Sequence, residues 1–94
     1  VPDPHGWGDV ENAIQMVNAI RDAWIEVSPE DRETFTKNAA QLNSELKQLD
    51  TWIAQQIQTI PPERRKLVTT HDAFQYYARA YGLSIIGTLI GIST

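Results

Sequence analysis

Apolar residues recur at three- and four-residue spacing through the first two thirds of the chain. The first run starts after Asp9 and the second after Ser28, and Pro61 with Pro62 closes the second. This spacing puts the apolar side chains on one face of a helix. The sequence therefore predicts two amphipathic helices, with apolar faces formed by Val10, Ala13, Ile14, Val17, Ile20, Trp24 and Val27, and by Phe35, Ala39, Leu42, Leu46, Leu49, Ile53, Ile57 and Ile60.

The boundaries of both helices carry recognisable signals. Asp9 is a suitable N-cap, and Glu11 places an acid in the first turn. Ser28 is expected to cap the second helix, with Pro29 at the first helical position and Asp31 completing a capping box. A helix over residues 29–60 would be roughly 48 Å long at 1.5 Å per residue.

The last third of the chain predicts a different type of structure. Residues 66–70 are short, apolar and β-branched, as in a strand, and residues 84–92 form a second apolar run. Thr70 is expected to cap a helix over about residues 72–81, which Gly82 would end. Apolar strands flanking a helix favour a parallel βαβ unit that is covered on both faces. Since two strands do not make such a sheet alone, we expect further strands from a larger protein or from another copy.

Composition narrows the classes of protein that fit. The 94 residues are 41% hydrophobic and 21% charged with a net charge of −4, which indicates one small globular domain or a piece of a larger one. The acidic balance argues against a nucleic-acid partner, because phosphate binding needs a basic patch. The sequence contains no cysteine and no apolar run long enough to span a bilayer, and none of these residues is expected to be a signal peptide. Residues 1–4 are interpreted as a truncated or processed start.

The two histidines of the chain are the candidate metal ligands. His5 lies in the motif D-P-H-x-W and His71 in L-V-T-T-H-D-A-F, each where a strand or loop precedes a helix. Neutral imidazole is the commonest metal ligand in proteins. Two histidines on separate, rigidly connected elements could form half of a metal site; the alternative is that each only hydrogen-bonds locally.

Several neighbours of the histidines have two interpretations. Asp3 and Asp72 could each accept a hydrogen bond that orients an imidazole. Asp3 could equally form a turn with Pro4, and Asp72 could be an ordinary acid of a first helical turn. Trp7 either walls the site or belongs to the core. The aromatic residues at helical spacing near the C-terminus are expected to pack against the sheet: Phe74, Tyr77 and Tyr81.

Enzyme signatures are absent from the sequence. It contains no glycine-rich phosphate loop, no nucleophile elbow and no H-E-x-x-H motif. Thr70, His71 and Asp72 do not make a catalytic triad, because sequence neighbours at a helix start do not generally face one another. We therefore expect that the protein is not an enzyme.

The order of these motifs resembles a known family. D-P-H-x-W, S-P-E-D, a long amphipathic helix, and then I-P-P-E-R-R-K-L-V-T-T-H-D-A-F and G-T-L-I-G-I-S-T occur together over essentially the whole chain. They resemble the metal-binding solute-binding proteins of zinc and manganese ABC importers. That family includes zinc-uptake periplasmic proteins and streptococcal surface lipoproteins once called adhesins.

The resemblance implies an α/β fold of two lobes joined by one long rigid helix, with the metal held between the lobes. On this basis residues 1–28 are the end of the N-terminal lobe, residues 29–60 the bridging helix, and residues 61–94 the start of the C-terminal lobe. The chain would then be a fragment of such a protein. The rigid helix would restrict lobe motion, so that metal capture depends on local loop and side-chain rearrangement.

The resemblance also implies a ligand set. His5 matches the histidine ligand of the N-terminal lobe, and His71 matches the first ligand of the C-terminal lobe, which is histidine or glutamate in this family. Histidine there resembles the zinc importers, and imidazole suits Zn²⁺ while Mn²⁺ prefers more oxygen. Zinc is thus expected more than manganese. A further histidine and a carboxylate would come from regions outside this sequence.

The implied function is capture of zinc and its delivery to the membrane permease of an ABC importer. The protein would be periplasmic or lipid-anchored outside the cytoplasmic membrane of a bacterium. Two alternatives stay open: a manganese- or iron-binding member of the same family, and a helical module for self-association in which the histidines are incidental. Metal dependence of folding or association would separate these alternatives.

Overall fold

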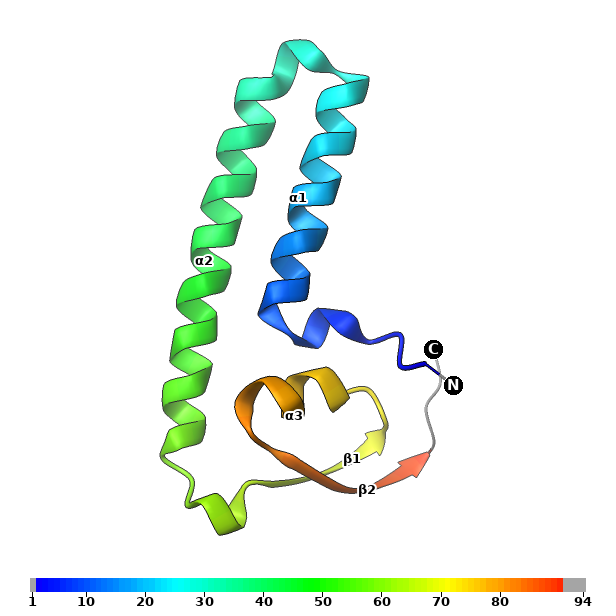
Figure 1. Ribbon diagram of the computed structural model, residues 1–94, viewed down its shortest axis with the longest axis vertical. Coiled ribbons are helices and arrows are strands. Elements are labelled where there is room, and N and C mark those ends of the chain that lie inside the picture. The colour runs from blue at the N-terminus through cyan, green and yellow to red at the C-terminus, as the bar shows by residue number, and fades with distance from the viewer. Residues whose placement is uncertain (1, 91–94) are drawn as a thin grey trace.

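A computed structural model describes residues 2–90 of the chain. A helical hairpin forms most of it, and a small α/β unit lies against the open end of the hairpin (Figure 1). The molecule is flat, with extents of 51 × 31 × 15 Å. The elements are, in order, η1 (Gly6–Gly8), α1 (Val10–Val27), η2 (Pro29–Asp31), α2 (Arg32–Gln58), η3 (Pro62–Arg64), β1 (Lys66–His71), α3 (Gln75–Tyr81) and β2 (Ser84–Ile90).

The first helix begins and ends as its sequence predicts. The Asp9 carboxylate accepts a hydrogen bond from the backbone N–H of Glu11 at 3.0 Å, so Asp9 is the N-cap. Helix α1 ends at Val27, and the N–H of Ser28 still donates to the carbonyl of Trp24. Residues of α1 and α2 lie side by side along the hairpin, and Asn43 donates to the Asn18 side chain at 2.9 Å across it (Figure 1).

The second helix is shorter than expected at both ends. Residues 29–31 form a separate 3-10 turn, and α2 itself covers Arg32–Gln58. The predicted capping box at Ser28 is wrong, because its hydroxyl bonds to the Glu30 and Asp31 carboxylates at 2.8 and 2.7 Å and not to a backbone N–H. At the other end the tandem prolines stop the helix early, since a residue before proline is disfavoured in helical geometry.

The C-terminal elements form the expected parallel βαβ unit. β1 and β2 pair in parallel from Lys66 opposite Ser84 to His71 opposite Ile90, with an irregularity after Leu67. The predicted second strand extended to residue 92, and its last two positions lie outside the described residues. The helix between the strands starts at Gln75, so the expected start near residue 72 and the capping role of Thr70 are wrong: Thr70 belongs to β1.

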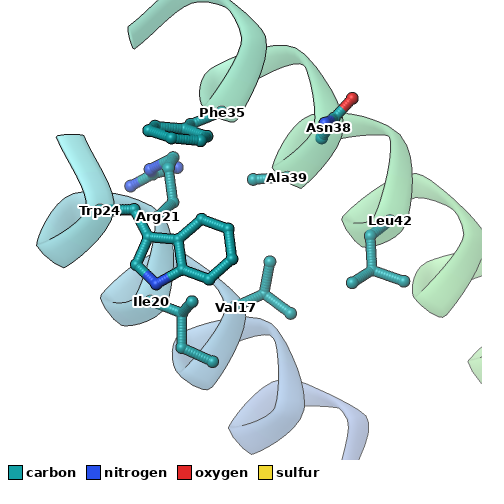
Figure 2. A pocket seen from close by; sticks show the side chains of 8 residues that line it. All are labelled: Val17, Ile20, Arg21, Trp24, Phe35, Asn38, Ala39 and Leu42. Atoms are coloured by element: carbon teal, nitrogen blue, oxygen red, sulfur yellow. The ribbon is translucent and has the colours of Figure 1, made fainter. Parts of the chain in front are cut away.

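The apolar surfaces of this chain are only partly covered. Among residues 2–90 the buried apolar residues are Val10, Ala39, Ala78 and Tyr81, whereas Trp24, Trp52 and Leu89 are 58%, 57% and 80% exposed. An apolar cavity of about 230 Å³ opens between α1 and α2 near the hairpin tip (Figure 2). Its walls include Ile20, Trp24 and Phe35, and the two rings meet edge to face at 5.4 Å. No helix of the described part is long and apolar enough to cross a membrane.

Gly82 is the position where the backbone itself demands a glycine. It has φ +76° at the end of α3, and Leu83 donates back to the carbonyl of Ala78 at 2.9 Å. Replacing Gly82 by alanine should lower the free energy of unfolding by about 1 kcal/mol, because a Cβ is strained in this left-handed conformation. Urea unfolding followed by circular dichroism measures the change. Gly87→Ala is the matched control, since a Cβ there meets no atom within 4 Å and φ is not positive; equal losses in the two variants would contradict the prediction.

Candidate metal centre

His5 lies in the loop that precedes η1 and is held there by a local turn. The Asp3 carboxylate oxygen Oδ1 accepts from the backbone N–H of His5 at 3.0 Å and lies 2.6 Å from the ring nitrogen Nδ1. Asn12, on the first turn of α1, donates to the carbonyl of Gly6 at 3.0 Å and so fixes the turn to the helix. His5 is only 5% exposed, and its ring has little freedom to move.

The Asp3–His5 contact decides which ring nitrogen of His5 is available to bind a metal ion. The hydrogen bond with the His5 ring, followed by that with the His5 backbone, lowers the pKa of the Asp3 carboxyl below its usual range. An ionised carboxylate can only accept hydrogen bonds, so the proton of a neutral His5 ring lies on Nδ1. Nε2 of His5 therefore carries the lone pair.

His71 approaches His5 from the far end of β1. It is the last residue of the strand, and Thr69 donates through its hydroxyl to the His71 carbonyl at 2.9 Å. The two imidazoles meet edge to face with centroids 5.1 Å apart, and their Nε2 atoms are separated by 3.3 Å. The structure thus brings together two predicted residues that are 66 positions apart in the sequence.

The 3.3 Å separation of the two Nε2 atoms fits either of two arrangements, a shared metal ion or a hydrogen bond. Two nitrogens each about 2.0–2.1 Å from a tetrahedral Zn²⁺ would lie roughly 3.4 Å apart. The same distance also suits a hydrogen bond in which one ring donates an N–H to the other. The pair can therefore share either a metal ion or a proton.

The structure places Trp7 and Asp72, for each of which the sequence left two interpretations open. Trp7 is not a core residue: it is 60% exposed, and its ring lies edge-on to His5 with centroids 5.4 Å apart. Asp72 accepts from the Gln75 side chain at 2.7 Å, and its other oxygen is buried with no partner among residues 2–90. Asp3 and Asp72 were the two candidate acceptors for an imidazole. Asp3 contacts the His5 ring, whereas the hydrogen bond seen for Asp72 is with the Gln75 side chain.

The described residues supply only part of a closed metal site. Residues 2–90 hold no group of three or more histidine, aspartate or glutamate side chains placed to bind one ion. Structural zinc sites normally have four ligands. Two buried carboxylate oxygens have no hydrogen-bond partner among residues 2–90. One is Oδ1 of Asp72, and the other is Oδ2 of Asp3, the residue that contacts His5.

A second polar contact near the site was not predicted. The Tyr81 hydroxyl donates to the Asp50 carboxylate at 2.6 Å and so joins α3 to α2. The expected stripe of Phe74, Tyr77 and Tyr81 is also incomplete, because Phe74 precedes the helix and is 43% exposed. The available signal was an acid at position 50 between the apolar positions 49 and 53 of α2, which indicates a polar partner beside the apolar face.

Comparison with known proteins gives a consistent family assignment. The sequence model of the family described as "Zinc-uptake complex component A periplasmic" matches residues 2–94. The manganese-binding lipoprotein MntA of Halalkalibacterium halodurans is 39% identical over 85 residues, which cover 90% of this chain and 28% of that protein. The iron-binding protein YfeA of Yersinia pestis is 37% identical over 82 residues, covering 87% and 26%.

A solved structure extends the similarity to the fold. The zinc-binding protein TroA of Treponema pallidum is 39% identical over 92 residues, covering 98% of this chain and 30% of that protein. Its structure superposes with a TM-score of 0.92 over 98% of this chain and 33% of the solved chain. The present chain therefore spans about a third or less of these relatives, and the predicted α/β fold of a fragment of this type is confirmed.

The family match, the relatives and the shared fold all agree with the family that the sequence motifs indicated. The chain belongs to the zinc-uptake component A family, the metal-binding solute-binding proteins of ABC importers, which are transport proteins and not enzymes.

Proposed function

We propose that this chain is the central part of a solute-binding protein that captures a transition-metal ion, with zinc as the principal cargo, and delivers it to the permease of an ABC importer. The observation that carries the proposal is the 3.3 Å separation between Nε2 of His5 and Nε2 of His71. This is the spacing of two imidazole ligands on one tetrahedral ion. His5 and His71 are the proposed metal ligands of this segment.

Asp3 supports this assignment through its effect on His5. A metal-ligating histidine commonly donates its other N–H to a carboxylate, which fixes the tautomer and makes the ligand more basic. Asp3 holds His5 in this way at 2.6 Å, with its side chain 8% exposed. The remaining ligands would come from outside the described residues.

The preference for zinc follows from ligand chemistry. Imidazole nitrogen suits borderline-soft Zn²⁺, whereas Mn²⁺ favours carboxylate and water oxygens. The similar proteins are described as binding manganese, iron or zinc, so manganese and iron are the alternative cargoes. Two nitrogen ligands and no carboxylate at position 71 favour zinc among the three.

The lobe assignment accompanies this function. Residues 1–28 would close the N-terminal lobe, residues 29–60 would bridge the lobes through α2, and residues 61–94 would open the C-terminal lobe. The uncovered apolar faces of α1 and of the two-stranded sheet support it, because both need more protein against them. By analogy with relatives described as periplasmic or as lipoproteins, the protein would act in the periplasm or on a lipid anchor outside the cytoplasmic membrane.

Self-association is the second candidate, with the histidines incidental to it. The apolar cavity between α1 and α2 is the observation that favours it. Association that is independent of metal and unchanged by loss of the histidines would support this candidate over metal capture.

Removal of either proposed ligand should abolish tight metal binding. In the complete protein, His5→Ala and His71→Ala should each weaken Zn²⁺ binding by more than the roughly 10–100-fold that follows loss of a group that only orients a ligand. Titration against a chromophoric zinc chelator measures the affinity. Thr70→Ala is the matched control, since Thr70 is exposed on the same strand; unchanged affinity in both histidine variants would refute the assignment.

The residue at position 71 should govern metal preference. His71→Glu replaces a nitrogen ligand by an oxygen ligand, so the ratio of Zn²⁺ to Mn²⁺ affinity should fall by about tenfold or more. Competition between the two ions, read by elemental analysis of the bound metal, gives this ratio. His71→Gln serves as the control because it has a similar size without the charge. A ratio that does not move in the glutamate variant would count against a ligand at this position.

The tautomer of His5 tests the role of Asp3 without any metal. Nitrogen-15 correlation spectra of the metal-free protein, recorded where the ring is neutral, should find the proton on Nδ1. Asp3→Ala should yield a mixture of tautomers and weaken Zn²⁺ binding by about 10–100-fold. Asp72→Ala is the control and should preserve the Nδ1 proton. A proton found on Nε2 of the unaltered protein would contradict the geometry.

A further inference from the structure

The distance between the two histidines depends on packing and not on nearby covalent connections. His5 and His71 are 66 positions apart, and the chain between them passes up α1 and down α2 before it reaches β1. Each histidine belongs to a different structural unit: His5 to the segment that leads through η1 into α1, and His71 to the βαβ unit (Figure 1). Contacts between these units must therefore set the 3.3 Å separation.

The first such contact is between η1 and α3. Gly8, three residues after His5, lies so close to Tyr77 that a Cβ built on it would be 3.2 Å from the Tyr77 backbone nitrogen and 3.4 Å from its Cβ. Backbone atoms of a helix do not move aside as a flexible side chain does. Glycine at position 8 is therefore what allows the turn after His5 to approach α3 this closely.

The second contact is between α3 and α2, through two tyrosines on one face of α3. The rings of Tyr77 and Tyr81 meet edge to face with centroids 4.9 Å apart, and the Tyr81 hydroxyl donates to Asp50 at 2.6 Å. Tyr81 is 8% exposed. Burial, and then the hydrogen bond to Asp50, raise the pKa of Tyr81 far above its ordinary value, so the hydroxyl remains a donor at any physiological pH.

We propose that Gly8, Tyr77, Tyr81 and Asp50 form a positioning relay that fixes the separation of His5 and His71 and thereby tunes metal affinity. None of these residues is a proposed metal ligand. The relay joins the turn after His5 to α3, and α3 to the C-terminal third of α2. Both histidine-bearing units are thereby held against the same long helix. The inference rests on the proposed function, since it assumes that His5 and His71 bind the metal.

The magnitudes favour a measurable effect. A Cβ at 3.2 Å from a backbone nitrogen requires the turn to move by a few tenths of an ångström. Metal–ligand distances in a competent site stay within about 0.2 Å of their preferred values. A displacement of the turn of that size is thus large enough to pull His5 out of ligating geometry while leaving the helices folded.

The experiment compares variants of the complete protein that strain or release the relay. Gly8→Ala pushes η1 off α3, Asp50→Leu removes the acceptor of Tyr81, and Tyr81→Phe removes only the hydroxyl. Asp50→Asn keeps an acceptor oxygen and is the conservative rescue, and Thr51→Ala, on the exposed side of the same helix, is the matched control. Each is measured for Zn²⁺ affinity by chelator competition, for the visible absorption spectrum of bound Co²⁺, and for the melting temperature of the metal-free form.

We expect about a tenfold or greater loss of affinity in Gly8→Ala and Asp50→Leu, with a changed Co²⁺ spectrum, and near-normal values in Asp50→Asn and Thr51→Ala. Tyr81→Phe should follow Asp50→Leu, which keeps the test valid if the leucine variant does not fold. A Co²⁺ spectrum that stays normal, with affinity lost only in step with melting temperature, would overturn the positioning role. So would normal affinity in Gly8→Ala and Tyr81→Phe.

Two further arms, His5→Ala and His71→Ala, separate this inference from the proposed function. If both histidine variants retain full affinity, the proposed function fails and the relay has no metal site to position. If they lose affinity while the relay variants do not, the proposed function stands and only the relay is refuted.

Discussion

The antiparallel packing of α2 along α1 is the constraint on which the rest of the structure depends. Helices joined by a short turn run back along each other, and the Asn18–Asn43 hydrogen bond at 2.9 Å fixes their register. With that register, the start of α1 lies level with the region of Asp50 on α2. The turn that carries His5 and the helix α3 therefore meet at one level of the molecule, where the polar contact of Asp50 with Tyr81 holds α3 in place.

This arrangement also explains the uneven distribution of buried surface. The hairpin covers the inner faces of its helices, yet the apolar residues near its tip still line an open cavity, and Val68, Ile86 and Leu89 of the strands are exposed. A chain that spans a third or less of its relatives would be expected to leave such surfaces open. By contrast, His5 is almost fully buried within this chain. The turn formed with Asp3, the Trp7 ring and the His71 ring surround it within the described residues.

Much of the fold could be predicted from the sequence because its signals are local. The apolar spacing, the Asp9 cap, the terminating glycine at position 82 and the β-branched strands each depend on neighbours within a turn or two. Predictions failed where the residues had more than one local option. Ser28 could bond to a backbone N–H or to nearby carboxylates and takes the latter, and the residues after His71 continue as a loop and not as a helix.

The candidate site was predictable only in part, because only some of its features depend on local sequence signals. The histidines were recognised by residue type and motif, and Asp3 by its position two residues from His5. The tertiary contacts were not, because neither the approach of Gly8 to Tyr77 nor the pairing of Asp50 with Tyr81 leaves a periodic signal in the sequence. An isolated acid beside an apolar helix face indicates that a partner exists, but the partner lies 31 positions away.

The position of Asn43 and Asp50 on one helix has a consequence for how the chain can vary in length. Seven residues make nearly two helical turns, so both side chains point from the same face of α2, one toward α1 and the other toward α3. An insertion of one residue between them would rotate one partner by about 100° relative to the other. Beyond Asn43 toward the hairpin tip, matched insertions in both helices would lengthen the hairpin and leave the two histidines where they are. Natural length variation should therefore accumulate at the tip and be excluded from residues 43–50.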